Sequence, residues 1–191
     1  MTVSGVDGPR IASLPTYDVE GRLLAVIEAV RGSSNKLKFE PALGVFVLHK
    51  VLPPGSVFPF DFGFVPQTLG ADGDPLDVLV LMDEAVPAGV VVPCRPLGVI
   101  EATQRATKDS LSARGERNDR LIGVADKTHL YARCRSLRDI DPHVLDEIEA
   151  FFEFYNQRMG KHFSPIGRDG VGQARRLIEE GRRMYSRRSE Q

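Results

Sequence analysis

The sequence predicts an α+β fold in which C-terminal helices pack against a small, closed or nearly closed antiparallel β-barrel. Two observations lead to this class. Between residues 22 and 125 the chain carries short β-branched and aromatic runs separated by Gly, Ser and Pro, as strands joined by turns do. After residue 141 the apolar residues recur at three- and four-residue spacing, which is the period of an amphipathic helix.

The barrel is expected to occupy about residues 21–135. Its strands are predicted at residues 22–30, 43–52, 57–65, 77–82, 89–102 and 120–125. Residues 1–20 are rich in Gly, Pro, Ser and Thr, so we expect a flexible N-terminal arm there. Residues 21–191 should then form a single domain, since a chain of 191 residues suits one domain with a substantial core.

Two helices are expected between about residues 141 and 188. The first begins with Asp141 as a good N-cap and Pro142 at the first helical position. Its single apolar face consists of Val144, Leu145, Ile148, Phe151, Phe152, Tyr155 and Met159. The second helix, about residues 170–187, has apolar residues on one side and many arginines on the other. Both helices are predicted to lie against the barrel.

The overall composition argues against several classes of protein. The formal net charge of −1 gives no reason to expect nucleic acid or a membrane as a partner. The N-terminus lacks the basic start and apolar core of a secretory signal, and no run approaches the ~20 apolar residues of a membrane span. The two cysteines, Cys94 and Cys134, are too few for a disulfide framework and lack metal-ligand spacing. We therefore expect a cytoplasmic protein.

Three carboxylates crowd into the stretch GADGDPLDVLVL, residues 70–81, at Asp72, Asp74 and Asp77. This stretch is either a solvated turn before a buried strand or the floor of a metal site. An EF-hand loop is excluded, because the sixth and twelfth positions counted from Asp72 hold Asp77 and Asp83 in place of Gly and Glu. Hard oxygen ligands with no His or Cys nearby suit Mg²⁺ or Mn²⁺ better than zinc.

A phosphate bound through Mg²⁺ also needs cationic side chains, and the stretch SSNKLKFE, residues 33–40, offers them. Lys36, Lys38 and Glu40 alternate there, so all three should point to one face of a strand. A solvated surface strand would show the same alternation, so the pattern alone leaves both interpretations open.

Several motifs together resemble the family I soluble inorganic pyrophosphatases. The run VFPFDFGFVPQTLGADGDPLDVLVL, residues 57–81, is similar to the family's signature region. Further matches follow in the family's order, at Glu28 in AVIEAV, the Lys-Phe-Glu triplet 38–40, RPLGVIEA at 95–102 and AFFEFY at 150–155. The likeness covers about residues 22–162.

This resemblance implies a small OB-like barrel with helices packed on it. It also implies hydrolysis of pyrophosphate to two phosphates with several Mg²⁺ ions, with Mn²⁺ or Co²⁺ as alternatives. In such chemistry carboxylates hold metals that activate a water, while metals and basic side chains take up phosphate charge. Bacterial members are usually hexamers, so the resemblance implies a homo-oligomer as well.

The resemblance assigns roles to the acidic residues. Asp72 and Asp77 would be metal ligands, with Asp77 bridging two ions. Asp74 would be the general base toward the attacking water. Glu28 and Glu40 would lie in the outer metal shell, where they support waters or a further ion.

It assigns substrate contacts as well. Lys38 would contact a phosphate oxygen, and Tyr155 would hydrogen-bond a phosphate, although Tyr155 could equally be a core residue of its helix. Lys50 aligns with a phosphate-binding arginine of the family and keeps its charge without the bidentate fork. Arg120 stands where the family has a lysine, and Lys161 adds a cation in the loop expected after the first helix.

Six positions depart from the family's pattern. They are Lys50, Phe58, Phe62, Gln104, Asn118 and Asn156. At Gln104 and Asn118 the family has aspartates, so either Asp119 or Asp109 moves in as a replacement metal ligand, or the chain has lost a metal. Replacement by Asp119 requires a register shift or bulge, because neighbouring residues of a strand point to opposite faces.

The leading hypothesis is a divergent Mg²⁺-dependent inorganic pyrophosphatase. A second hypothesis keeps metal-assisted phosphoanhydride hydrolysis but assigns a nucleoside polyphosphate or longer polyphosphate as substrate. A third is a catalytically weak member that binds phosphate or a partner, for which the arginine-rich last helix is the only positive support.

Overall fold

The computed structural model describes residues 11–106 and 115–190. Its strands are β1 (Leu23–Ala29), β2 (Asn35–Glu40), β3 (Val45–Val51), β4 (Asp61–Phe64), β5 (Asp77–Leu81), β6 (Val91–Ala106), β7 (Glu116–Arg117), β8 (Arg120–Ala125) and β9 (Lys161–Gly170). Its helices are α1 (Pro142–Arg158) and α2 (Val171–Ser189), with short 3₁₀ turns at Ile11–Ser13 and Leu137–Asp139.

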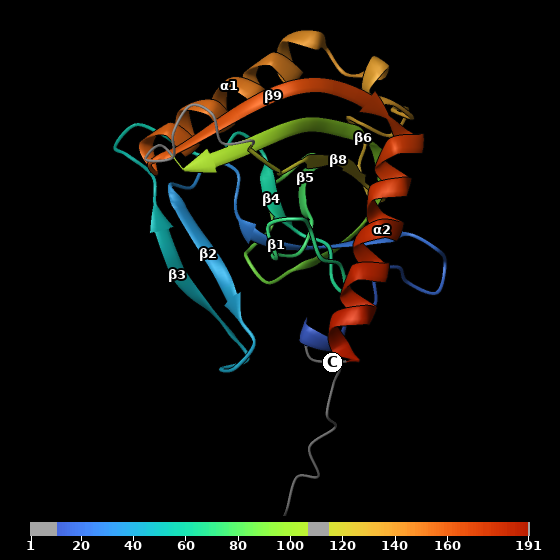
Figure 1. Ribbon diagram of the computed structural model, residues 1–191. Coiled ribbons are helices and arrows are strands. Elements are labelled where there is room, and N and C mark those ends of the chain that lie inside the picture. Colours follow the sequence, from blue (N-terminus) through green and yellow to red (C-terminus); the bar gives the residue numbers. More distant parts are fainter. Residues whose placement is uncertain (1–10, 107–114, 191) are drawn as a thin grey trace, which may run out of the picture.

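Five strands close into a ring (Figure 1). Their order is β1-β4-β5-β8-β6, and β6 pairs again with β1. The long strand β6 also pairs with β7 and β9, while β2 and β3 form a separate hairpin beside the ring. The predicted α+β class, a barrel with C-terminal helices packed on it, is confirmed. One pair, β5 with β8, runs parallel, because β8 enters the ring between β5 and β6.

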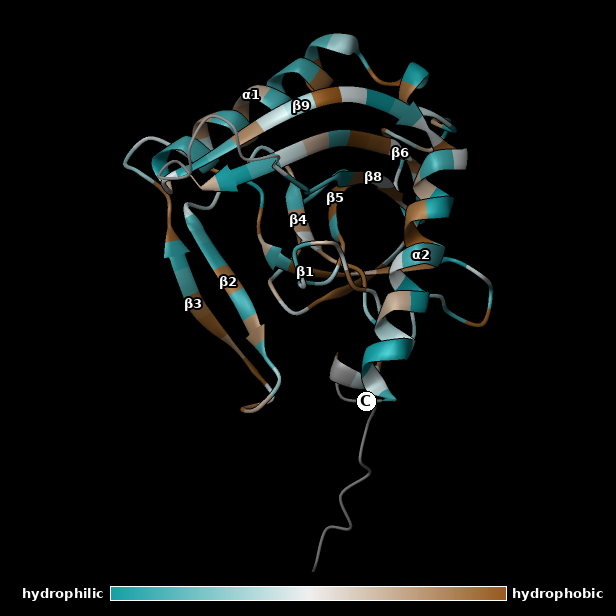
Figure 2. Cartoon of the chain, in the orientation of Figure 1, coloured by the Kyte–Doolittle hydropathy of each residue, from teal (hydrophilic) through white to brown (hydrophobic). Residues whose placement is uncertain are grey.

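The ring strands are buried on both faces, which explains their unbroken apolar runs. On β5, Leu79 and Leu81 belong to a core that includes residues of α1, whereas Val78 and Val80 belong to a second core that includes residues of α2. Figure 2 shows the apolar residues gathered on the ring strands and also on β3, while the helices change hydropathy from face to face. Each helix therefore covers one side of the same sheet.

Both helices begin close to where the sequence predicts. Asp141 caps α1, and its Oδ1 accepts a hydrogen bond of 2.9 Å from the backbone N–H of His143. The segment after α1 differs from the prediction, because the expected loop is the ten-residue strand β9, paired along β6. Among the described residues, no helix is both long and apolar enough to span a membrane.

The predicted flexible arm falls partly outside the described residues. Within its described part, Thr16 is buried, and its hydroxyl donates to the carbonyl of Pro66 at 2.9 Å. Tyr17 forms an isolated bridge with Leu23 at the start of β1. The extent of the arm and the single-domain boundary stay predictions.

Candidate active site

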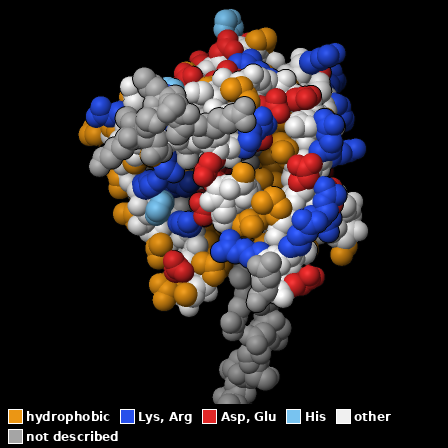
Figure 3. Space-filling view, viewed as in Figure 1, with side chains coloured by type: hydrophobic (Ala, Val, Ile, Leu, Met, Phe, Trp, Pro, Cys, Tyr) orange, Lys and Arg blue, Asp and Glu red, His pale blue; other side chains and the backbone are white. Residues whose placement is uncertain are grey.

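A cleft of about 550 Å³ lies between the β2–β3 hairpin and the ring. It brings together most of the predicted site residues. They are Glu28, Lys38, Glu40, Lys50, Asp72, Asp74, Asp77, Gln104, Asn118, Arg120, Tyr155, Asn156 and Lys161. Figure 3 shows basic and acidic side chains gathered next to one another between the hairpin and the body of the protein. The cleft thus has a positive and a negative side.

The positive side is a lysine wall, which we define as Lys36, Lys38, Lys50 and Lys161. Across the hairpin Lys36 is the direct register partner of Lys50, an arrangement of like charges that destabilises a strand pair. The pKa of Lys50 lies below its ordinary value, because of burial first and then because of the charges of Lys36, Lys161 and Lys38. An anion bound against these lysines would relieve their mutual repulsion.

The negative side is built on a tight loop. The backbone N–H of Gly70 donates to the Asp74 carbonyl at 2.7 Å, and the Asp74 N–H donates to Asp72 Oδ1 at 3.2 Å. Gly73 adopts a φ of 81°, which favours glycine. Asp77 is the first residue of β5, so the loop delivers its third carboxylate from a buried strand.

Helix α2 supports this loop from behind. The N–H of Leu69 donates to the carbonyl of Gly181 at 3.0 Å. The Thr68 hydroxyl donates to the Val65 carbonyl at 2.6 Å and accepts from the N–H of Leu76 at 3.0 Å. A loop bonded on both sides in this way holds its carboxylates in a fixed arrangement.

Burial and neighbouring negative charges change the pKa values of the carboxylates on the negative side. Burial raises the pKa of Asp72, and the negative charges of Asp77 and Asp74 raise it further. Burial also raises the pKa of Glu28, whose Oε1 accepts from the Phe39 N–H at 3.1 Å. Carboxylates under these conditions are stabilised by a cation in the cleft.

The two sides meet at Lys38 and Asp74. Lys38 Nζ lies 3.2 Å from Asp74 Oδ1, and both side chains are about half exposed or more. An exposed pair of this kind is weak, so Lys38 can leave Asp74 when a stronger anion enters.

Tyr155 lies at the back of the cleft within the aromatic core. Its ring centroid is 6.0 Å from that of Phe58 and 5.9 Å from that of Phe151. Burial raises the pKa of its hydroxyl to about 12, with a further contribution from Asp77. The hydroxyl is therefore protonated at neutral pH and can donate to an anion. The two interpretations of Tyr155, as core and as site residue, are compatible.

Arg120 is the most buried cation of the cleft. One of its terminal nitrogens lies 2.7 Å from Asp77 Oδ2, and its side chain is 5% exposed. The carbonyls of Asn118 and Asp119 and the Asn118 Oδ1 also lie within hydrogen-bonding distance of this nitrogen, so they share its two hydrogens with Asp77. The guanidinium carbon lies 5.0 Å from the Phe152 ring centroid and 5.3 Å from that of Phe163, so two rings hold it in place.

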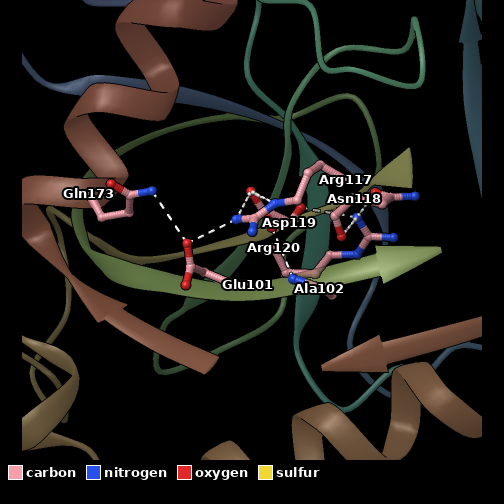
Figure 4. A network of polar contacts seen from close by, with 7 residues as sticks. All are labelled: Glu101, Ala102, Arg117, Asn118, Asp119, Arg120 and Gln173. Atoms are coloured by element: carbon pink, nitrogen blue, oxygen red, sulfur yellow. Dashed lines mark hydrogen bonds and ion pairs between the residues drawn. The ribbon is translucent and has the colours of Figure 1, made fainter. Parts of the chain in front are cut away.

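Asp119 does not reach this cleft. Its carboxylate accepts from the Ala102 N–H at 2.9 Å and pairs with Arg117, also at 2.9 Å. Figure 4 shows Asp119 in a chain of polar contacts that runs through Arg117 and Glu101 to Gln173, away from Arg120. Asp119 lies between β7 and β8 and lines a neighbouring pocket that Asp72 and Asp77 also line, so its role as a metal ligand stays a prediction.

Comparison with known proteins decides the family. The family model described as inorganic pyrophosphatase matches residues 25–186. The chain belongs to the inorganic pyrophosphatase family. An inorganic pyrophosphatase of Nostoc sp. is 35% identical over 175 residues, which cover 92% of this chain and 98% of that protein.

Solved structures of pyrophosphatases share the fold. The enzyme of Thermus thermophilus superposes with a TM-score of 0.81 at 32% identity, covering 93% of this chain and 99% of that one. The enzyme of Helicobacter pylori gives a TM-score of 0.78 at 31% identity, covering 91% and 98%. The resemblance inferred from the motifs is therefore confirmed over most of the chain.

Apart from Lys50, which belongs to the lysine wall, the positions that depart from the pyrophosphatase pattern fall into two groups. Phe58 and Phe62 are core residues, 1% and 2% exposed, whose stacked rings extend the aromatic cluster beneath the cleft. Gln104, Asn118 and Asn156 line the cleft itself. Asn156 is buried, and its side-chain amide donates to the Phe152 carbonyl at 2.8 Å. Asp109, the other predicted replacement ligand, lies outside the described residues.

His49, Gln67 and Tyr185 are among the lining residues to which the sequence analysis assigned no role. His49 is the extra residue of a bulge opposite Lys36 and Leu37, so it lines the cleft beside Lys50 in spite of strand alternation. Gln67 has a φ of 51°, which is uncommon for a residue with a side chain. Tyr185 comes from α2. No local sequence signal marks any of the three.

Pyrophosphatases of this family use divalent metals, and the donors of the negative side are of the right type. Asp72, Asp77, Glu28 and Glu40 offer the hard oxygen ligands that Mg²⁺ and Mn²⁺ prefer. Among the described residues, however, no group of three or more His, Cys, Asp or Glu side chains converges closely enough to hold an ion unaided. Mg²⁺ commonly completes its shell with waters and substrate phosphate, so the negative side fits such an ion. Among the described residues, Gln104 and Asn118 contribute amides to the cleft where carboxylates were expected.

Proposed function

We propose that this chain hydrolyses inorganic pyrophosphate in the cleft with the help of divalent metal, Mg²⁺ in the first place. The observation that carries the proposal is the opposition of a lysine wall and a carboxylate loop within one cleft. A small polyanion bound with its metal neutralises both sides at once. Membership of the pyrophosphatase family supports the same substrate.

In the proposed complex the basic side binds the two phosphates. Lys36 and Lys50 face one phosphate as a pair, which relieves their mutual repulsion. Lys161 and the protonated hydroxyl of Tyr155 contribute further donors. These contacts orient the bridging oxygen and take up charge as the leaving phosphate departs.

Asp74 is the proposed general base. When pyrophosphate enters, Lys38 moves from Asp74 to a phosphate oxygen, which frees the carboxylate to accept a proton from the attacking water. The water oxygen bonds to one phosphorus while the bridging P–O bond breaks, and the second phosphate leaves. Asp72, with Glu28 and Glu40 nearby, would hold a divalent ion, which would neutralise phosphate charge and make the attacking water more acidic.

A longer phosphoanhydride is the second candidate substrate. A cleft of about 550 Å³ falls within the usual range for sites that bind larger organic ligands. Its walls also include apolar groups such as Phe39, Phe64 and Pro66, which could pack against a nucleoside.

One assay separates these candidates. Phosphate release is measured from pyrophosphate, ATP and tripolyphosphate, each with Mg²⁺ and with a chelator. Turnover of pyrophosphate that depends on metal and exceeds the other two supports the proposal. Absence of pyrophosphate turnover with Mg²⁺, Mn²⁺ and Co²⁺ alike contradicts it.

We also propose that the chain assembles as a homo-oligomer, a hexamer by family resemblance. The hairpin and its flanks expose several apolar side chains, namely Leu43, Val45, Leu48, Val51 and Val57. Exposed apolar residues grouped on one element are typical of an interaction surface. Sedimentation equilibrium at micromolar concentration tests this, and a monomer would contradict it.

A further inference from the structure

The cleft contains a cation that belongs to the chain itself. The guanidinium of Arg120 is paired with Asp77 at 2.7 Å and almost completely buried. Stacking near Phe152 and Phe163 fixes its position, and its Nε is buried without a partner among the described residues. A buried N–H without a hydrogen-bond partner is rare in folded proteins. The positive charge of Arg120 therefore explains its position in the cleft better than its hydrogen bonds do.

Besides Asp77, two described residues on the Arg120 side of the cleft are neutral amides. Asn118 accepts from the guanidinium, and Gln104 lines the same cleft from β6. The carboxylate of Asp119 faces the opposite side of the sheet, where Arg117 neutralises it. Asp77 is therefore the carboxylate that Arg120 neutralises, and the two amides bind a further divalent ion less strongly than carboxylates would, because they bring no negative charge.

We propose that the guanidinium of Arg120 takes the place of one divalent cation in the substrate cleft, so that metal binds on the side of Asp72 and Glu28. Asp77 then serves chiefly as the partner of Arg120 and does not bridge two ions. This inference rests on the proposed function for its substrate, although it concerns the number of bound metals. A guanidinium keeps its charge throughout the working pH range, so it can replace an ion permanently.

The inference predicts how metal binding responds when the charge of Arg120 is removed. The experiment counts bound Mn²⁺ by equilibrium dialysis with pyrophosphate left out, on wild type and on Arg120→Met. Without the guanidinium, Asp77 is an unpaired carboxylate next to the metal site. We expect Arg120→Met to bind one more Mn²⁺ per chain, or to bind Mn²⁺ at least about tenfold more tightly. Arg120→Lys, which keeps a charge, is the matched control and should resemble wild type.

A double variant tests the pair as a unit. Removing one partner of a buried ion pair destabilises a fold strongly, whereas replacing both is often tolerated. The variant with Asp77→Asn and Arg120→Met should therefore fold even if Arg120→Met alone does not, as circular dichroism would report. It should bind the same number of Mn²⁺ ions as wild type, with an affinity within about threefold, since an ion pair with no net charge is replaced by two neutral side chains.

Two results would overturn the inference. One is the same Mn²⁺ number and affinity for wild type and a folded Arg120→Met. The other is loss of an ion, or of more than about tenfold in affinity, in the double variant, because Asp77 would then be an essential metal ligand. Since these measurements contain no pyrophosphate, a failure of the hydrolysis assay would refute the proposed function without affecting the metal count.

Discussion

The contact between α2 and the carboxylate loop predicts that a single methyl group behind the cleft will impair activity. Gly181 lies on the buried side of α2, and a Cβ there would stand 2.9 Å from Leu76 Cδ1 and 3.2 Å from Thr68 Cβ. Leu76 directly precedes Asp77, and Thr68 hydrogen-bonds its backbone. A Gly181→Ala methyl group therefore pushes on the residues that position the loop.

The size of the effect on stability follows from two opposing terms. Overpacking costs roughly 1–3 kcal/mol, and the lower end applies because Leu76 Cδ1 is the end of a side chain that can rotate. Ala in place of Gly inside a helix contributes about 1 kcal/mol of stabilisation. The free energy of unfolding of Gly181→Ala should thus stay within about 1 kcal/mol of wild type. Its kcat/KM should fall by about tenfold, since small displacements of catalytic groups are costly.

Gly172 provides the matched control. It lies on the same helix, and no atom lies within 4 Å of a Cβ built there. Gly172→Ala should keep full activity and be as stable as wild type or slightly more so. Urea unfolding and steady-state phosphate release measure both quantities. If Gly181→Ala is stabilised like the control and retains its kcat/KM, then α2 does not position the loop and the reasoning is refuted.

Four further outcomes are expected. Asp74→Asn should lower kcat by at least about hundredfold in phosphate-release assays, and an unchanged rate would exclude Asp74 as the base. Tyr155→Phe keeps the ring packing and should raise the KM for pyrophosphate several-fold with little change in the thermal midpoint, whereas a large loss of stability would indicate a core role alone. The pKa of Lys50 is lowered, so its charge is lost as the pH rises through that value. The KM for pyrophosphate should therefore climb at alkaline pH. Lys50→Arg, which keeps its charge, should suppress that climb if Lys50 causes it. A chelator should abolish turnover and added Mg²⁺ should restore it, whereas full activity with the chelator present would exclude a role for the metal.

The acidic half of the cleft could be predicted from sequence because its determinants are local. Asp72, Asp74 and Asp77 lie in one short loop whose Gly and Pro residues define the turn, and a buried strand follows at once. Alternation likewise predicted that Asn118 and Asp119 would point opposite ways, and their side chains do so although both lie between β7 and β8. Such inferences need only the neighbours in the chain.

The features that sequence reasoning missed depend on distant pairing. β9 contains Pro165 and two Gly residues and has no strand pattern, yet it runs along β6 for its whole length. Its Pro165 lies opposite Ala102, beside an irregularity in that ladder, where a missing N–H is tolerated. His49 reaches the cleft only because of a bulge against β2. The parallel pairing of β5 with β8 also depends on the closure of the ring.

The charges of the cleft explain why the amides at Gln104 and Asn118 are compatible with a working site. Asp77 is already neutralised by Arg120, so further carboxylates beside it would need another cation in a partly buried place. With amides there, the carboxylates that remain for a metal ion are Asp72, Glu28 and Glu40, and the lysine wall lies on the other side. A metal ion neutralises the carboxylates, and a phosphate neutralises the lysine wall. The departures at Gln104 and Asn118 are thus consistent with one another, because neither adds a carboxylate near the guanidinium that Asp77 already pairs with.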